Sequence, residues 1–122
     1  MARIWLVEDD RNLANLTRTA LEKNGYIVDV YFEAAGLLEE AKKHKPDLIL
    51  MDVILPDVSG PEAVKALKKE SSLRGIPVIF LTALLSAEES EMGLTVENIQ
   101  YRTLGKPYEI KQLLELVESA LQ

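Results

Sequence analysis

Residues 48–52 read Leu-Ile-Leu-Met-Asp, a run of four apolar side chains that ends on a carboxylate. Similar short apolar runs occupy residues 4–7, 27–30 and 78–81, and a weaker one occupies residues 101–104. Runs of this length without strict polar alternation are typical of strands buried on both faces of a sheet. The sequence therefore predicts five short strands.

Longer amphipathic segments separate these runs and predict the helices. The expected helices lie between about residues 11 and 24, 34 and 43, 60 and 69, and 108 and 121, and a short, irregular fourth helix is expected within Ser86–Asn98. Asn24-Gly25 ends the first helix, and Ser59 is the expected N-cap of the third. Strands that alternate with helical crossovers predict an α/β fold, a parallel sheet covered by helices on both faces.

The amino-acid composition limits the classes of function that this chain can have. The 122 residues suit one domain, 1–122, and 48% hydrophobic with 28% charged residues is a globular composition. There is no cysteine, and His44 is the one histidine. The net charge of -6 repels phosphate backbones, so direct nucleic-acid binding is not expected. No apolar run approaches the ~20 residues of a membrane span. We expect a cytoplasmic domain without a membrane segment.

Polar side chains follow four of the predicted strands. Glu8-Asp9-Asp10 follow the first strand, Asp52 ends the third, Thr82 follows the fourth and Lys106 follows the fifth. The carboxyl ends of parallel strands meet at one edge of the sheet, so these groups should converge there. Crowded carboxylates repel unless a cation neutralises them, and an all-oxygen site suits Mg²⁺. A magnesium ion, a lysine and a hydroxyl group together form a binding site for a phosphoryl group, which Asp52 would attack in line.

Four motifs carry a family resemblance. Val7-Glu8-Asp9-Asp10, Met51-Asp52-Val53-Ile54-Leu55-Pro56, Leu81-Thr82-Ala83 and Gly105-Lys106-Pro107-Tyr108 together resemble the receiver domain of two-component response regulators. The resemblance covers essentially the whole chain. It implies a flavodoxin-like, doubly wound (βα)5 fold with a five-stranded parallel sheet in the order 2-1-3-4-5. It also implies a sensor histidine kinase or histidine phosphotransfer protein as phosphodonor, a downstream effector, and a homodimer formed on phosphorylation.

The resemblance assigns a role to each matching residue. It implies that Asp52 is the phosphoacceptor and that Asp9 binds Mg²⁺ directly, with Glu8 acting through water. Ile54 would offer the metal its backbone carbonyl. Thr82 and Lys106 would each contact a phosphoryl oxygen, and the Lys106–Pro107 bond would be cis.

Two departures from the family pattern concern the switch and the lifetime of the phosphoryl group. Receivers place an aromatic residue three positions before the lysine, whereas this chain has Thr103 there and Tyr101 two positions earlier. Either Tyr101 takes the switch role through a shifted register, or the usual coupling to the threonine is absent or altered, which we favour. Ile54 and Leu84 are aliphatic where polar side chains can orient the hydrolytic water, which predicts slow autodephosphorylation.

Other functions fit the motifs less well. A haloacid-dehalogenase-like phosphatase needs an aspartate where Ile54 stands, and a flavodoxin needs a phosphate loop where Glu8-Asp9-Asp10 would repel the flavin phosphate. A pseudo-receiver that docks partners without phosphorylation stays an alternative. Because the chain ends after its last helix, we expect no effector domain, and we expect a signalling module rather than an enzyme with its own diffusible substrate.

Overall fold

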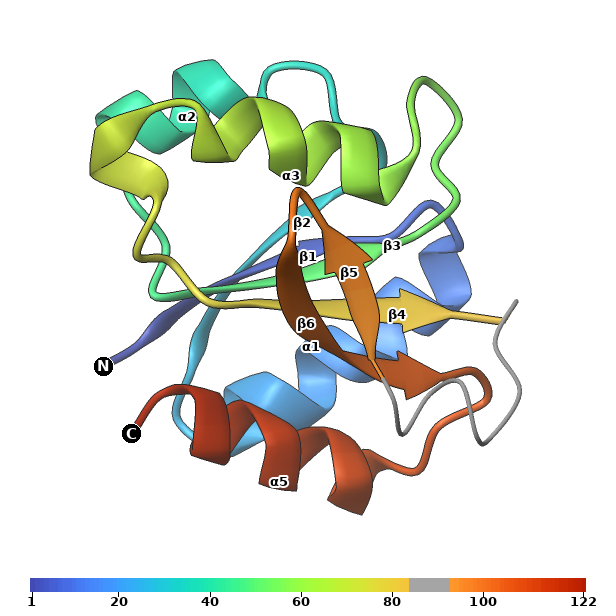
Figure 1. Ribbon diagram of the computed structural model, residues 1–122. Helices are drawn as coiled ribbons and strands as arrows, with labels where there is room; N and C mark the ends of the chain where they lie inside the picture. Colours follow the sequence, from blue (N-terminus) through green and yellow to red (C-terminus); the bar gives the residue numbers. More distant parts are fainter. Residues whose placement is uncertain (84–92) are drawn as a thin grey trace.

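The computed structural model describes residues 1–83 and 93–122, which form a central sheet between two layers of helices (Figure 1). In chain order the elements are β1 (Arg3–Val7), α1 (Arg11–Lys23), β2 (Ile27–Tyr31), α2 (Leu37–Lys43), β3 (Leu48–Asp52), α3 (Gly60–Lys68), the 3-10 helix η1 (Ser71–Leu73), β4 (Val78–Thr82), β5 (Leu94–Val96), β6 (Ile99–Gly105) and α5 (Ile110–Ala120). None of the described helices is both long enough and apolar enough to span a bilayer.

The predicted α/β fold is confirmed. The sheet order is β2-β1-β3-β4-β6-β5, and neighbouring strands run parallel from β2 through to β6. The predicted fifth strand, residues 101–104, lies within β6, so the expected order 2-1-3-4-5 holds for these five strands. The sheet has one strand more than predicted, because β5 is added at the edge, antiparallel to β6.

The short, irregular fourth helix expected within Ser86–Asn98 falls mainly on residues 84–92, which lie outside the described residues. At the end of that segment, Leu94–Val96 forms strand β5, which the sequence did not predict. Glu97 and Asn98 connect β5 to β6 with left-handed φ angles of 51° and 66°. Two consecutive positive φ angles match the right-handed twist of a tight hairpin, and the β-branched Thr95 and Val96 favour extended backbone. These residues therefore form an edge hairpin that the apolar runs did not predict.

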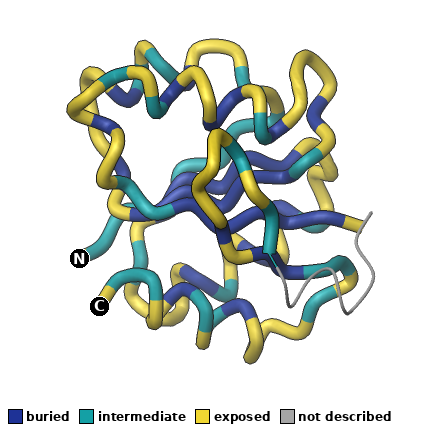
Figure 2. The backbone as a smooth tube through the Cα atoms, in the orientation of Figure 1, coloured by how far each residue is buried: buried dark blue, intermediate teal, exposed yellow. Residues whose placement is uncertain are grey.

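The sheet is buried on both faces, as its apolar runs predict (Figure 2). On one face, side chains such as Trp5, Met51 and Phe80 pack against α2 and α3. On the other face, side chains such as Leu6 and Leu50 pack against α1 and α5. This double coverage fixes the register of β1, β3 and β4, because a slip of one residue would exchange the two cores.

The helix ends explain how the loops at one edge of the sheet are held. Asp10 is the N-cap of α1 and accepts a hydrogen bond from the Leu13 amide, and Ser59 caps α3 by accepting from the Glu62 amide. Gly25, with a φ of 90°, follows the end of α1, as predicted. The two N-caps fix where these helices begin, Asp10 three residues after the end of β1 and Ser59 seven residues after the end of β3.

Candidate functional site

Three charged side chains meet at the carboxyl edge of the parallel strands. The Lys106 Nζ lies 2.8 Å from the Asp52 Oδ2 and also donates to the Glu8 Oε1. Asp52 ends β3, while Glu8 and Lys106 directly follow β1 and β6. The convergence that the sequence predicts for these residues is therefore present.

Glu8 is the most deeply buried member of the site. Its side chain is 1% exposed, and its Oε2 accepts a hydrogen bond from the Asp10 amide at 3.1 Å. The pKa of Glu8 is raised to about 7, chiefly by burial and also by the neighbouring Asp52, although the hydrogen bond from Lys106 acts to lower it. A carboxyl group in this position holds its negative charge only with help from a cation.

Lys106 is the cation that faces both carboxylates. Burial lowers the pKa of its ammonium, but the hydrogen bonds to Asp52 and Glu8 outweigh that effect and raise the pKa overall. Its backbone N–H donates to the Thr82 carbonyl at 2.9 Å, which joins the ends of β4 and β6. The Lys106–Pro107 bond is cis, as the resemblance implies.

Asp52 is held by the loop that follows it. The Ile54 amide donates to the Asp52 Oδ1 at 3.3 Å, and the side chain of Asp52 is 8% exposed. A Cβ at Gly60 would lie 2.2 Å from the Asp52 carbonyl oxygen, so α3 approaches β3 this closely only with glycine. Sequence reasoning placed Gly60 in the helix start and missed this contact. The available signal was a glycine in the first turn of a helix, where alanine would be the better helix former.

Three acidic residues offer a set of oxygen ligands. One carboxylate oxygen each from Glu8, Asp9 and Asp52 lie within 4.8 Å of one another. Glu8 and Asp52 are buried while Asp9 is exposed, so the set opens to solvent on one side. Hard oxygen donors in this number fit Mg²⁺, which keeps several waters. Ile54 follows Asp52 by two positions with its side chain 55% exposed, and its loop is closed by a bridge to Ser59.

Thr82 on β4 and Tyr101 on β6 lie at different positions along this pair of hydrogen-bonded strands. Thr82 is buried at the end of β4 and pairs with Gly105, one residue before Lys106. Tyr101 lies four residues earlier on β6, where its ring packs edge-on against Phe80 with centroids 5.5 Å apart. Four residues of strand span about 13 Å, so the Tyr101 backbone is remote from the Thr82 level. Thr103 is buried between the two levels, opposite Phe80.

A doubly wound parallel sheet with a carboxylate cluster and a lysine at its carboxyl edge defines the receiver class of signalling domains. The chain belongs to the response regulator receiver domain family, whose model matches residues 4–118.

The relatives agree with this assignment. The polar-differentiation response regulator DivK of Brucella anthropi is 36% identical over 118 residues, 97% of this chain and 94% of that protein. The response regulator ArlR of Staphylococcus haemolyticus is 31% identical over 122 residues, which is all of this chain but 53% of that protein. The chain thus spans about half the length of ArlR. The crystal structure of the chemotaxis response regulator CheY4 of Vibrio cholerae matches with a TM-score of 0.86 at 29% identity, covering 99% of each chain.

Proposed function

We propose that this domain accepts a phosphoryl group on Asp52 from a sensor histidine kinase or a histidine phosphotransfer protein. The observation that carries the proposal is the position of the Asp52 carboxylate. It lies within hydrogen-bond distance of Lys106 and within the same 4.8 Å oxygen cluster as Glu8 and Asp9. A nucleophilic carboxylate beside a fixed ammonium and a set of metal ligands is suited to phosphoryl transfer.

The chemistry balances without further reagents. An Asp52 oxygen forms a bond to phosphorus while the bond from phosphorus to the donor's imidazole nitrogen breaks, and the electron pair of that bond stays on the imidazole. Lys106 stabilises negative charge on a phosphoryl oxygen, and the Thr82 hydroxyl would donate to another. A bound Mg²⁺, held by Glu8, Asp9, Asp52 and the Ile54 carbonyl, would neutralise charge on the transferring oxygens.

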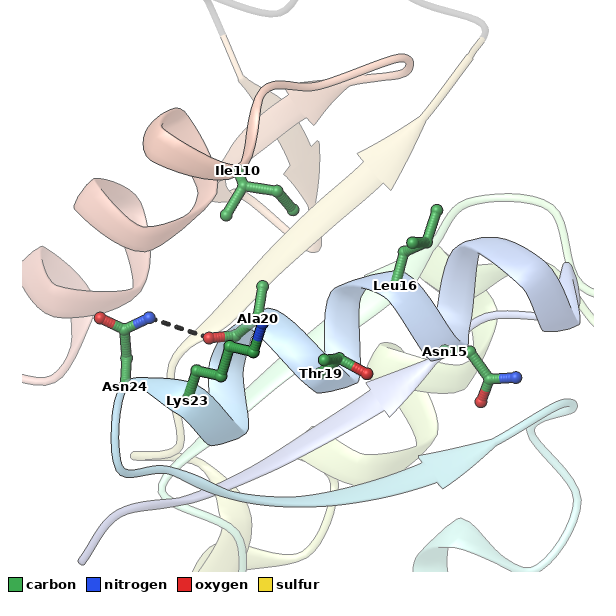
Figure 3. A pocket seen from close by; sticks show the side chains of 7 residues that line it. All are labelled: Asn15, Leu16, Thr19, Ala20, Lys23, Asn24 and Ile110. Atoms are coloured by element: carbon green, nitrogen blue, oxygen red, sulfur yellow. Dashed lines mark hydrogen bonds between the residues drawn. The ribbon is translucent and has the colours of Figure 1, made fainter.

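The donor would dock on the groove between α1 and α5. This groove has a volume of about 480 Å³, and Figure 3 shows Ile110 of α5 across from Leu16 and Ala20 of α1. Leu16 is 67% exposed, and Ile110 is exposed as well. Helix α1 begins two residues after Asp9 and Leu16 lies in its second turn, so a partner seated on these apolar side chains contacts the helix that starts at the phosphorylation site.

Phosphorylation would then change affinity for a downstream effector or favour a homodimer, which makes the domain a cytoplasmic switch rather than an enzyme. The aliphatic Ile54 beside Asp52 supports slow autodephosphorylation, because an apolar side chain does not orient a hydrolytic water. Leu84, the second residue in that prediction, lies outside the described residues. The net charge of -6 argues against direct binding to nucleic acid.

The deciding experiment is incubation with acetyl phosphate and Mg²⁺, read by intact mass. The wild-type chain should gain the mass of one phosphoryl group, whereas Asp52→Asn and a sample with chelator should not. An unmodified wild-type chain would favour the pseudo-receiver, a second candidate that the position of Tyr101 keeps in view. Leu16→Asp should slow transfer from a phosphorylated kinase while leaving acetyl phosphate labelling intact; slowing of both would argue against docking on this groove.

A further inference from the structure

A second groove lies on the opposite side of the sheet from α1 and α5, between α3 and the hairpin of β5 and β6. Its volume is about 360 Å³. Figure 1 shows the hairpin rising in front of the sheet towards α3. The groove does not include Glu8, Asp52 or Lys106, so it is separate from the phosphorylation site.

Positive charge gathers along this groove. Four of the chain's 14 lysine and arginine residues line it, in a protein of net charge -6. They are Lys65, Lys68, Lys69 and Arg74. Glu97 is the one acidic residue among the described lining residues, and its carboxylate lies 3.1 Å from the Lys65 Nζ across the groove. The described residues that line the groove therefore carry a net positive charge, opposite in sign to the net charge of the whole chain.

The floor of the groove is apolar and fixed. Val64 of α3 and the ring of Tyr101 are buried, while Ile99 at the start of β6 is 51% exposed beside them. The Tyr101 ring is held by its edge-on contact with Phe80. An exposed branched side chain next to a buried aromatic ring offers apolar area to a partner, and cations surround it.

Lys68 keeps one wall of the groove in place. Its Nζ donates to the carbonyls of Leu73 and Arg74, at 3.4 and 2.8 Å, and also to that of Ile76. Burial lowers the pKa of Lys68. The Arg74 Nε donates to the Lys68 carbonyl at 3.2 Å, which leaves the other two guanidinium nitrogens for a ligand. Because the Lys68 ammonium donates to three carbonyls, the other cations for a ligand are Lys65 and Lys69, and both Lys69 and Arg74 are exposed.

We propose that this groove binds an acidic segment of a partner protein that also carries an aliphatic or aromatic side chain. The apolar side chain would pack on Ile99 and Tyr101, and the acidic side chains would face Lys69 and Arg74. Glu97 already places a carboxylate against Lys65, and an incoming carboxylate would compete with it for that lysine. The charge of the groove selects an acidic ligand, and its apolar floor distinguishes that ligand from a simple anion.

The test is an amide chemical-shift titration of the whole chain with a short, glutamate-rich peptide that carries leucines. Two matched peptides have lysine in place of glutamate, or serine in place of leucine. The acidic, leucine-bearing peptide should shift the amides of the hairpin and of α3, and each matched peptide should bind at least about fivefold more weakly, as expected when one of two contact types is lost.

Variants on the groove sharpen the result. Lys69→Glu with Arg74→Glu should weaken binding about tenfold or more, whereas Glu97→Gln should strengthen it roughly two- to fivefold by freeing Lys65. The control is Lys43→Glu with Lys45→Glu, near the end of α2, which makes the same change in net charge and should alter the affinity less than about twofold.

Three results would overturn the proposal: no amide shift at millimolar peptide, equal binding of the lysine peptide, or equal weakening of binding by the control pair of substitutions. Shifts in the groove that follow protein concentration without peptide would identify a second copy of this chain as the occupant. Because the titration needs no phosphorylation, its failure would leave the assignment of Asp52 untouched, and loss of phosphorylation would leave the groove untouched.

Discussion

Replacing Lys106 with methionine measures how much the lysine ammonium stabilises the two carboxylates of the site. Methionine keeps most of the volume and removes the ammonium that faces Glu8 and Asp52, which are 1% and 6% exposed. Removing one partner of a buried ion pair costs about 3–5 kcal/mol. Since the Lys106 side chain is 15% exposed, the lower end applies, and about 3 kcal/mol in metal-free buffer at pH 8 is expected. In a domain of this size that corresponds to roughly 10 °C in Tm.

The assay is urea unfolding in the presence of a chelator, followed by the fluorescence of the buried Trp5 and by circular dichroism. Glu8→Gln in the Lys106→Met background should recover part of the loss, because one of the two unpaired charges is gone. The loss should also shrink at pH 5.5, where Glu8 takes up a proton. Lys111→Met, which removes an exposed lysine from α5, is the control. A loss below about 1 kcal/mol at pH 8, or no recovery in the double variant, would refute the reasoning.

Three further predictions test separate parts of the structure. Because the pKa of Glu8 is raised to about 7, the folded chain between about pH 5 and 7.5 still holds a proton that the unfolded chain has released. The free energy of unfolding of the metal-free chain, measured by urea titration, should therefore fall as the pH rises through that range. A rise over the range, or a fall that saturating Mg²⁺ leaves unchanged, would contradict this. Gly60→Ala should cost about 1–3 kcal/mol in the same assay and slow labelling by acetyl phosphate, since its Cβ would meet the Asp52 carbonyl; Ser59→Ala should lose only its cap, about 1 kcal/mol, and label normally. Glu97→Gly should raise Tm, because glycine relieves a left-handed φ of 51°, whereas Glu97→Ala should lower it; both variants lose the ion pair to Lys65, so a lower Tm for both would show that this ion pair outweighs the backbone strain.

The strands and the polar edge were predictable because their signals are local and repeated. The run at residues 48–52 shows burial on both faces without any knowledge of its neighbours, and a parallel sheet follows once helical segments separate such runs. Topology then brings Glu8, Asp52 and Lys106 to one edge, since all three follow or end parallel strands. The convergence of these three side chains could therefore be predicted from the order of the strands and the positions of the residues along the sequence.

The missed features depend on contacts between distant parts of the chain or on turn geometry. The closeness of Gly60 to the Asp52 carbonyl is a property of how α3 packs on β3; a glycine in the first turn of the helix indicates a close approach but does not identify the atom that is approached. The β5–β6 hairpin rests on Glu97 and Asn98 in left-handed conformations. An Asn-Gly or Asp-Gly pair would have predicted such a hairpin turn, but the pair Glu97-Asn98 does not.

The register of β6 decides which parts of the domain can be coupled to the phosphorylation site. Lys106 is joined to β4 through the Thr82 carbonyl, so the end of β4 and the ammonium that faces Asp52 form one hydrogen-bonded unit. Tyr101 belongs to a different unit, because its ring packs on Phe80 and lines the groove beside α3. A tyrosine held in that core cannot also act at the Thr82 level without breaking the aromatic contact, since the ladder separates the two positions by four residues. Tyr101 therefore lines the second groove, four residues before the Gly105 that pairs with Thr82.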